Sequence, residues 1–143
     1  MNSIAVVNGP NLNLLGSRET HHYGTETLDA INRELLSAFK DRVKLEFFQS
    51  NHEGAIIDFL QALKNCGGIV INPGAFTHTS VAIRDALLAI NLPTIEVHLS
   101  NVFRREEFRK TSFVSDIALG VISGLGARGY HFALLALLDR IKQ

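Results

Sequence analysis

Short apolar runs alternate with longer stretches of helical periodicity along the whole sequence. Runs typical of buried strands occupy 4–7, 43–48, 69–71, 94–97 and 118–122. Apolar residues recur every three or four positions, as in amphipathic helices, over 28–39, 56–63, 81–90 and 130–141. Strands that are separated by helices predict a parallel sheet with helices on both faces. The chain is therefore expected to form an α/β fold around five parallel strands.

The order of the strands follows from the rules of chain connection. Crossovers between parallel strands are right-handed, which removes most of the possible orders. Among those that remain we expect 2-1-3-4-5, the order of a flavodoxin-like three-layer sandwich. With 143 residues, 46% of them hydrophobic and 20% charged, the chain has the size and composition of one globular domain. Residues 1–143 are expected to form that single domain.

Local signals predict where the helices begin and end. Thr27 is expected to cap the first helix, and Thr79 is expected to cap the third. Gly67-Gly68 is expected to end the second helix pattern, with Cys66 near that end. Pro93 follows the third helix and prevents its continuation.

Charge and cysteine content limit the classes of partner. Fourteen basic and fourteen acidic side chains cancel, and no basic run stands out, so non-specific binding to nucleic acid is not expected. The one cysteine cannot form an intrachain disulfide, which fits a reducing compartment. No apolar stretch approaches the length of a membrane span, and 4–7 is too short for a signal peptide. We expect a cytoplasmic protein that binds neither nucleic acid nor membrane.

The strand predicted at 94–97 carries ionisable groups at its carboxyl end. Side chains alternate between the faces of a strand, so Glu96 and His98 point one way while Ile95 and Val97 point the other. We favour an acid–base imidazole in His98, oriented by a hydrogen bond for which Glu96 is a possible partner. A histidine that is merely hydrogen-bonded at the strand end is the second interpretation. A shared metal, with His78 as the third ligand, is the last.

Three polar loops should meet at one edge of the sheet, because each follows the carboxyl end of a strand. These loops span 8–26, 72–80 and 98–109. They carry a phenol, two imidazoles, amides and arginines: Asn11, Arg18, Tyr23, Asn72, His78, His98, Ser100, Arg105 and Arg109. This set suits proton transfer on an anionic, hydroxylated small molecule. The first loop is long, and we interpret it as a lid.

Tyr23 is a candidate base only if its pKa is lowered, since a free phenol titrates near pH ~10. A cation within about 4–6 Å favours the phenolate, and Arg18 lies on the same predicted lid. Arg18 can do this without losing its own proton. The alternative, which these two residues alone favour, is that Tyr23 covers the edge of the core and Arg18 is solvated.

Two further motifs have plain structural explanations. The residues 124–129 match GxGxxG between a strand and a helix, but no strand follows to carry the acidic group that binds ribose. Close packing of strand and helix explains these glycines better. The charges of 105–109 have helical spacing, which is usual for a solvated face. A substrate role for Arg109 requires the three loops to converge.

Seven segments, in order, resemble the type II 3-dehydroquinate dehydratase family almost from end to end. They are NGPNLNLLG at 8–16, RE at 18–19 with YG at 23–24, QSNHEG at 49–54, NPGAFTHTS at 72–80, IEVHLSN at 95–101, REEFR at 105–109 and GVISGLG at 120–126. The resemblance implies a flavodoxin-like catalytic domain. It implies that no cofactor is used when water is removed from 3-dehydroquinate to give 3-dehydroshikimate, a step of the shikimate pathway.

The same resemblance assigns roles to individual residues. Tyr23 would take the proton from C2 with help from Arg18, His98 would protonate the departing C1 hydroxyl, and Asn11 would act on the enolate side through a water. Substrate binding would fall to six further residues: Asn72, His78, Asp85, Leu99, Ser100 and Arg109. The roles of Glu96 and Arg105 stay open. The family implies a homododecamer, a tetramer of trimers, in which Asp85 reaches a neighbouring site.

Two other classes of function are compatible with such a fold, because a fold does not fix a function. A flavin- or nucleotide-binding electron carrier would bind its cofactor and be coloured, although the chain lacks a complete phosphate loop. A non-catalytic regulatory or interaction domain would not need Tyr23, Arg18 and His98 to converge.

Overall fold

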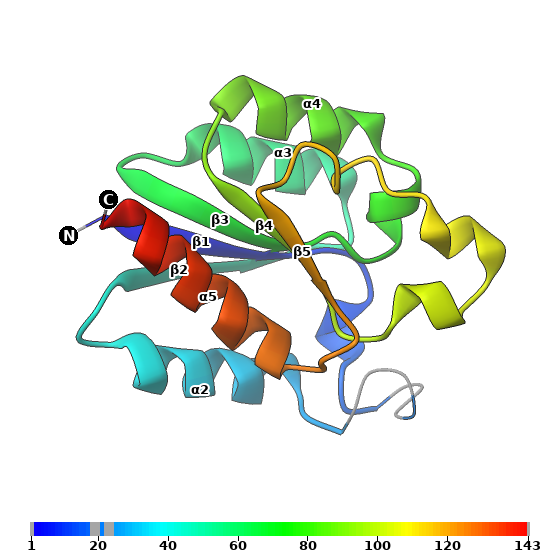
Figure 1. Ribbon diagram of the computed structural model, residues 1–143, viewed down its shortest axis with the longest axis horizontal. Coiled ribbons are helices and arrows are strands. Elements are labelled where there is room, and N and C mark those ends of the chain that lie inside the picture. The colour runs from blue at the N-terminus through cyan, green and yellow to red at the C-terminus, as the bar shows by residue number, and fades with distance from the viewer. Residues whose placement is uncertain (1, 18–20, 22–24, 143) are drawn as a thin grey trace.

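The computed structural model describes residues 2–17, 21 and 25–142 (Figure 1). Five parallel strands form one sheet in the order β2-β1-β3-β4-β5. Their bounds are Ser3–Asn8 (β1), Lys44–Gln49 (β2), Cys66–Asn72 (β3), Thr94–His98 (β4) and Gly120–Ser123 (β5). The predicted fold class and strand order are therefore confirmed. β5 begins two residues later than expected.

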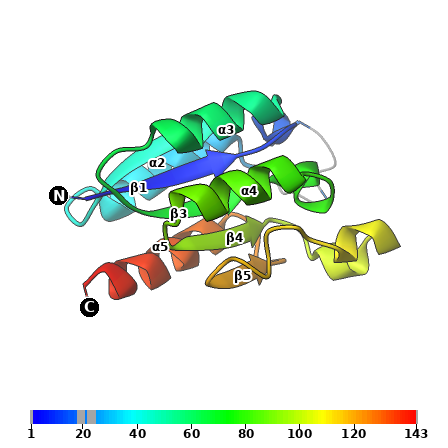
Figure 2. The ribbon, with the colours of Figure 1, turned by 90° about the horizontal axis from the view of Figure 1, so that it is seen from above.

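Helices cover both faces of the sheet, so that the molecule has three layers (Figures 1 and 2). Helices α3 (Glu53–Ala62) and α4 (Val81–Ile90) lie on one face, and α2 (Leu28–Phe39) and α5 (Arg128–Ile141) lie on the other. In the described parts of the chain, four short 3-10 turns lie beyond the strands: η1 (Leu12–Leu14), η2 (Gly74–His78), η3 (Val102–Arg104) and η4 (Glu107–Lys110). Among the described residues, no helix has both the length and the apolarity to cross a membrane.

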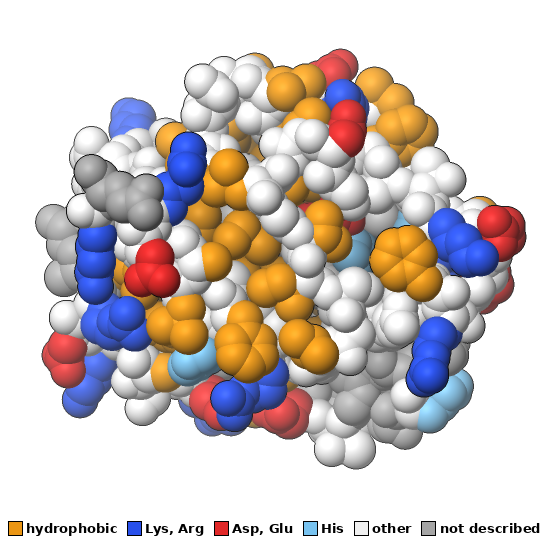
Figure 3. All heavy atoms as spheres, viewed as in Figure 1, with side chains coloured by type: hydrophobic (Ala, Val, Ile, Leu, Met, Phe, Trp, Pro, Cys, Tyr) orange, Lys and Arg blue, Asp and Glu red, His pale blue; other side chains and the backbone are white. Residues whose placement is uncertain are grey.

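The sheet has two edge strands, β2 and β5. Hydrophobic side chains gather on the surface around β5 and the adjacent part of α5 (Figure 3). Exposed side chains there include Leu119, Val121 and Phe132. This surface is more apolar than the edge of a solvated sheet usually is.

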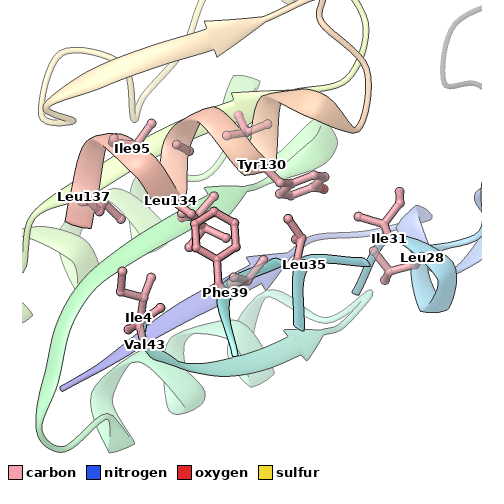
Figure 4. Packing of buried hydrophobic residues seen from close by; sticks show 14 of the residues in the cluster. Ile4, Leu28, Ile31, Leu35, Phe39, Val43, Ile95, Tyr130, Leu134 and Leu137 are labelled. Atoms are coloured by element: carbon pink, nitrogen blue, oxygen red, sulfur yellow. The ribbon is translucent and has the colours of Figure 1, made fainter. Parts of the chain in front are cut away.

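The alternation of side chains along the central strands separates two cores. Ile4 and Val6 of β1, with Ile95 and Val97 of β4, pack against α2 and α5 (Figure 4). Ala5 and Val7 face the other way, into the cluster beneath α3 and α4. Glu96 lies between Ile95 and Val97, so its side chain points toward the α3/α4 layer, as the strand pattern predicted.

Helix starts show one correct and one wrong prediction. The Oγ1 of Thr27 accepts a hydrogen bond from the Ala30 N–H at 3.1 Å, which confirms it as the cap of α2. The cap of α4 is Ser80 and not Thr79, since the Ser80 Oγ accepts from the Ile83 N–H at 2.9 Å. The preceding turn explains the shift: the Thr79 N–H closes η2 by donating to the Phe76 carbonyl.

Gly67-Gly68 does not end a helix. Helix α3 ends at Ala62, and both glycines lie inside β3, of which Cys66 is the first residue. A Cβ on Gly68 would lie 3.1 Å from the side chain of Leu137 and 3.2 Å from the Pro93 carbonyl oxygen. The glycines therefore let α5 approach the sheet closely, a requirement that the local sequence does not reveal.

Gly9 is the point at which the loops after β1 and β3 touch. Its N–H donates to the Asn72 carbonyl at 2.8 Å, and a Cβ built on it would lie 2.2 Å from the Pro73 carbonyl oxygen. No side chain fits between these two backbones. The close approach holds the two loops together at the carboxyl edge of the sheet.

We expect Gly9→Ala to destabilise the protein by about 1–3 kcal/mol, because one of the two loops must move. Gly54→Ala is the matched control, since a Cβ at Gly54 meets nothing within 4 Å and alanine favours the α3 helix. Its stability should be unchanged or higher by up to about 1 kcal/mol. Urea unfolding measures both differences. Equal stabilities of the two variants would contradict the packing described at Gly9.

Candidate active site

A pocket opens at the carboxyl ends of β1, β3 and β4. Its walls come from the three loops that were predicted to converge, and the convergence is confirmed for their described residues. The lining residues are Pro10, Asn11, Leu12, Leu15, Asn72, Gly74, Ala75, His78, His98, Leu99, Ser100, Val102, Arg105 and Arg109. The pocket thus combines amides, two imidazoles and two guanidinium groups with an apolar wall.

Glu96 and His98 lie on the same face of β4 and form a buried pair. The His98 Nε2 is hydrogen-bonded to the Glu96 Oε2. Glu96 is fully buried and His98 is 7% exposed. A carboxylate without access to water is stable only when its oxygens are paired. The open question of the Glu96 role is therefore answered structurally: it orients the His98 ring.

Three hydroxyl groups complete the surroundings of Glu96. The Thr77 Oγ1 donates to Oε2 at 2.7 Å, and the Ser115 Oγ donates to Oε1 at 2.5 Å. The Ser112 Oγ lies 3.2 Å from each carboxylate oxygen. The Ser112 oxygen also accepts the N–H groups of residues 114 and 115 at 3.0 Å, which fixes this turn.

These contacts keep Glu96 charged. Burial raises the pKa of Glu96, but the hydrogen bond and charge of His98, and then the Ser115 and Thr77 hydroxyls, outweigh burial and hold the pKa below its usual value. An ionised carboxylate can only accept hydrogen bonds. The His98 Nε2 must then carry a proton, which leaves Nδ1 as the ring nitrogen that can exchange a proton with a molecule in the pocket.

His78 carries its hydrogen on the other ring nitrogen. Its Nδ1 lies 2.6 Å from the Thr111 carbonyl oxygen, which only accepts, so Nδ1 carries the hydrogen. Burial lowers the pKa of His78, the Thr111 hydrogen bond opposes this, and the neighbouring His98 and Arg109 lower it further, with a net decrease. A neutral ring then presents Nε2 as an acceptor. The ring centroids of His78 and His98 lie 6.4 Å apart.

The glycine-rich turn after β5 fixes the backbone at the end of β4. The Gly124 N–H donates to the His98 carbonyl at 3.2 Å, and the Gly126 N–H donates to the Leu99 carbonyl at 3.0 Å. Both glycines have positive φ, 90° and 62°, which a side chain would strain. A Cβ on Gly129 would lie 3.2 Å from Val97. The prediction that this motif serves close packing of strand and helix is confirmed. The absence of dinucleotide binding stays a prediction.

The two arginines of the third loop contribute to the pocket wall. The Arg105 side chain is 8% exposed and the Arg109 side chain 21% exposed, so these two side chains are not part of the solvated surface that Glu106, Glu107 and Phe108 form. Glu107–Lys110 forms the short 3-10 turn η4 instead of an α-helix, and Arg105 follows η3. The Arg109 Nε donates to the Glu106 carboxylate at 2.6 Å, which directs the guanidinium along the wall.

The remaining candidates differ in their placement. Arg18 and Tyr23 lie outside the described residues, so their placement stays a prediction. Asp85 is exposed on α4 and does not line the pocket. Asn11 does line it, in a left-handed conformation (φ 68°), with its N–H donated to the Asn51 Oδ1 at 2.9 Å. Within the described part, no three His, Cys, Asp or Glu side chains are grouped so that they could hold a metal.

Sequence reasoning did not identify the Ser112 and Ser115 hydroxyls or the buried Tyr130, whose hydroxyl contacts Asn72. The two serines lie 16 and 19 positions from Glu96, and Tyr130 lies 58 positions from Asn72. No spacing rule connects such positions. The only available signal was a fully buried acid in an apolar strand, which must find partners somewhere.

Comparison with known proteins identifies the family of this chain. The sequence model of the family described as dehydroquinase class II matches residues 2–138. This chain belongs to that family. A protein of Polynucleobacter necessarius named 3-dehydroquinate dehydratase is 58% identical over 144 residues, which cover 99% of this chain and 97% of that one. The protein of the same name from Prochlorococcus marinus is 52% identical, with 98% and 97% covered.

Solved structures place the same fold in the dehydroquinase family. The crystal structure of type II dehydroquinase from Butyrivibrio crossotus superposes with a TM-score of 0.92 at 47% sequence identity, over 95% of this chain and 97% of that chain. At this similarity the five-stranded sheet and its helix layers are shared.

The charge on Glu96 predicts a pH dependence of stability for this dehydroquinase fold. Because its pKa is lower in the folded chain than in the unfolded one, the unfolded chain binds the proton first. The stabilisation is thus present above the usual carboxyl pKa of 4.5 and is lost as the pH falls through the lower folded value.

Glu96→Gln should therefore reduce the loss of stability below that pH. Urea unfolding between about pH 3 and pH 7 should give a plot of unfolding free energy against pH that is shallower by up to about 1.4 kcal/mol per pH unit at the acid end. The overall stability of the variant can differ without affecting this slope. Parallel plots for the two proteins would contradict an ionised Glu96.

Proposed function

We propose that this chain is a 3-dehydroquinate dehydratase, a lyase that removes water from 3-dehydroquinate to give 3-dehydroshikimate in the shikimate pathway. The observation that carries the proposal is the His98 ring in the pocket, held by a buried carboxylate with its Nδ1 left for a ligand. Membership of the class II dehydroquinase family supplies the substrate. We further propose that residues 1–143 act as one catalytic domain, in the cytoplasm, without a cofactor.

The elimination needs a base, a place for negative charge and an acid. Removal of the C2 proton moves its electron pair toward the adjacent carbonyl and gives an enolate. When the enolate collapses, hydroxide leaves C1 and must be protonated to depart as water. His98 supplies that proton from Nδ1, and the Glu96 charge stabilises the imidazolium until then. A positioned proton donor of this kind contributes about 10²–10⁴-fold in rate.

The base is Tyr23 in this proposal, with Arg18 lowering the phenol pKa and stabilising the transition state. This assignment rests on the family resemblance of the first loop. Asn11 acts on the enolate side through a water, and its left-handed backbone and hydrogen bond to Asn51 support a fixed position for it. The phenolate and the imidazolium would then act on adjacent carbons of one bound ring.

Backbone geometry supports the binding roles of Leu99 and Ser100. The C=O and N–H groups of a trans peptide point in opposite directions. Because the His98 and Leu99 carbonyls point to Gly124 and Gly126, the N–H groups of Leu99 and Ser100 point away from that turn. Two adjacent N–H donors in the pocket wall suit a substrate oxygen that carries negative charge. Arg109 would add a positive charge on the same side.

Side chains supply the remaining contacts. The His78 Nε2 would accept a hydrogen bond from a substrate hydroxyl, because Nδ1 is occupied by Thr111. Asn72 would offer its amide. Asp85 would act from a neighbouring subunit, since within its own chain it is exposed on α4.

Incubation of the purified protein with 3-dehydroquinate tests the function, because the conjugated product absorbs in the ultraviolet. We expect turnover by the wild type and a loss of about 10²–10⁴-fold for Tyr23→Phe and for His98→Gln, with unchanged circular dichroism. His52→Gln is the matched control, since His52 is exposed and outside the pocket. Folded wild-type protein without turnover would refute the function, and an active Tyr23→Phe would remove Tyr23 as base.

Assembly into a homododecamer, a tetramer of trimers, is part of the proposal. Val81, Asp85 and Leu88 are exposed at positions i, i+4 and i+7 of α4, so they form one stripe on the helix surface. The apolar surface around β5 is a second such area (Figure 3). Contact between subunits across the α4 stripe would bury Val81 and Leu88 and carry Asp85 to a neighbouring pocket.

Light scattering after size exclusion measures this assembly. Leu88→Lys should lower the molar mass, because a lysine charge would be placed against another subunit, and activity should fall with it. Asp85→Ala should keep the mass of the wild type but lose activity. A wild-type monomer with full activity would contradict both the assembly and the role of Asp85.

A further inference from the structure

Tyr130 of α5 links the carboxyl ends of the central strands β1 and β3 by hydrogen bonds. Asn8 and Asn72 are paired across β1 and β3, and their side chains are buried, 1% and 3% exposed. Tyr130 lies in the first turn of α5 and is fully buried, with its ring inside the cluster between α5 and α2 (Figure 4). Its hydroxyl contacts Asn72, which lines the pocket.

The hydrogen bonds of this group have a fixed direction. The Tyr130 hydroxyl donates its single hydrogen to the Asn8 Oδ1 at 2.5 Å, so toward Asn72 it can only accept. The Asn72 Nδ2 accordingly donates to it at 2.9 Å. The Asn72 Oδ1 accepts the Gly74 N–H at 3.2 Å. Burial raises the pKa of Tyr130, so the hydroxyl keeps the hydrogen on which this direction depends.

We propose that Tyr130 is a positioning residue that fixes which way the Asn72 carboxamide faces in the pocket. The inference rests on the proposed function, in which Asn72 contacts the substrate. With one Nδ2 hydrogen on Tyr130, the other is left to donate to an oxygen of the bound molecule. The phenol of α5 thereby determines that this wall presents a donor to substrate oxygen, although it does not touch the substrate.

A phenylalanine at this position would keep the packing and lose only the hydroxyl. Gly129 packs the start of α5 against Val97 and Ile122, because a Cβ added to it would lie 3.2 and 3.3 Å from their side chains. This close packing fixes the position of the Tyr130 ring independently of its hydroxyl. Without the hydroxyl, only the Gly74 N–H at Oδ1 still holds the Asn72 amide, so a half turn that exchanges its donor for its acceptor costs less. The Asn8 Oδ1 would lose its partner at the same time.

Steady-state kinetics of Tyr130→Phe tests the proposal. We expect KM to rise about 3–10-fold, the effect of one uncharged hydrogen bond, with kcat nearly unchanged because the reacting groups stay in place. In an Asn72→Ala background the same substitution should raise KM no further, since the residue it positions is gone. Leu134→Ala in the same helix is the control: it should lower stability and leave KM unchanged.

An activity-independent readout separates this inference from the proposed function. The Nδ2 hydrogen that Asn72 donates to Tyr130, followed by NMR, should be protected from exchange in the wild type, and this protection should be lost in Tyr130→Phe. If the wild type fails to turn over 3-dehydroquinate but the protection behaves this way, the function is wrong and the positioning stands. Unchanged KM and protection in Tyr130→Phe, or additive effects in the double variant, would overturn the positioning.

Discussion

The buried charge of Glu96 is the constraint around which the pocket is organised. A carboxylate in the middle of an apolar strand would be costly without partners, and its oxygens receive one imidazole and three hydroxyls. Those partners come from η2, from the end of β4 and from the turn at 112–115. The need to pair this carboxylate therefore orients the His98 ring and fixes the positions of η2 and of the turn at 112–115.

The two helix layers contribute to the pocket in different ways. On the α3/α4 side, the Glu96 carboxylate orients the His98 ring, and the Thr111 carbonyl holds the His78 Nδ1 so that Nε2 is left as an acceptor. On the α2/α5 side, the Tyr130 hydroxyl orders the asparagines at the ends of β1 and β3. The parallel sheet brings both arrangements to one edge, where each strand ends in a polar side chain.

Periodicity predicted the architecture because each strand and helix obeys its own local rule. The positions of the strands, the cap at Thr27 and the shared face of Glu96 and His98 were accessible in this way, and the rule of right-handed crossovers led to the sheet order. Local rules failed where a distant backbone decides the residue. Gly67-Gly68 resembles a helix end but accommodates α5, and the cap of α4 moves from Thr79 to Ser80 because a 3-10 turn precedes it. The partners of Glu96 depend on tertiary folding alone.

The protonation of the Glu96–His98 pair can be observed directly by NMR. Protein labelled with ¹⁵N in histidine and ¹³C in the glutamate carboxyl groups should, at neutral pH, show an ionised Glu96 and a His98 Nε2 that carries a hydrogen. Binding of a substrate-like ligand should then perturb Nδ1 more than Nε2. A protonated Glu96 carboxyl, or a His98 Nε2 without hydrogen, would contradict the account.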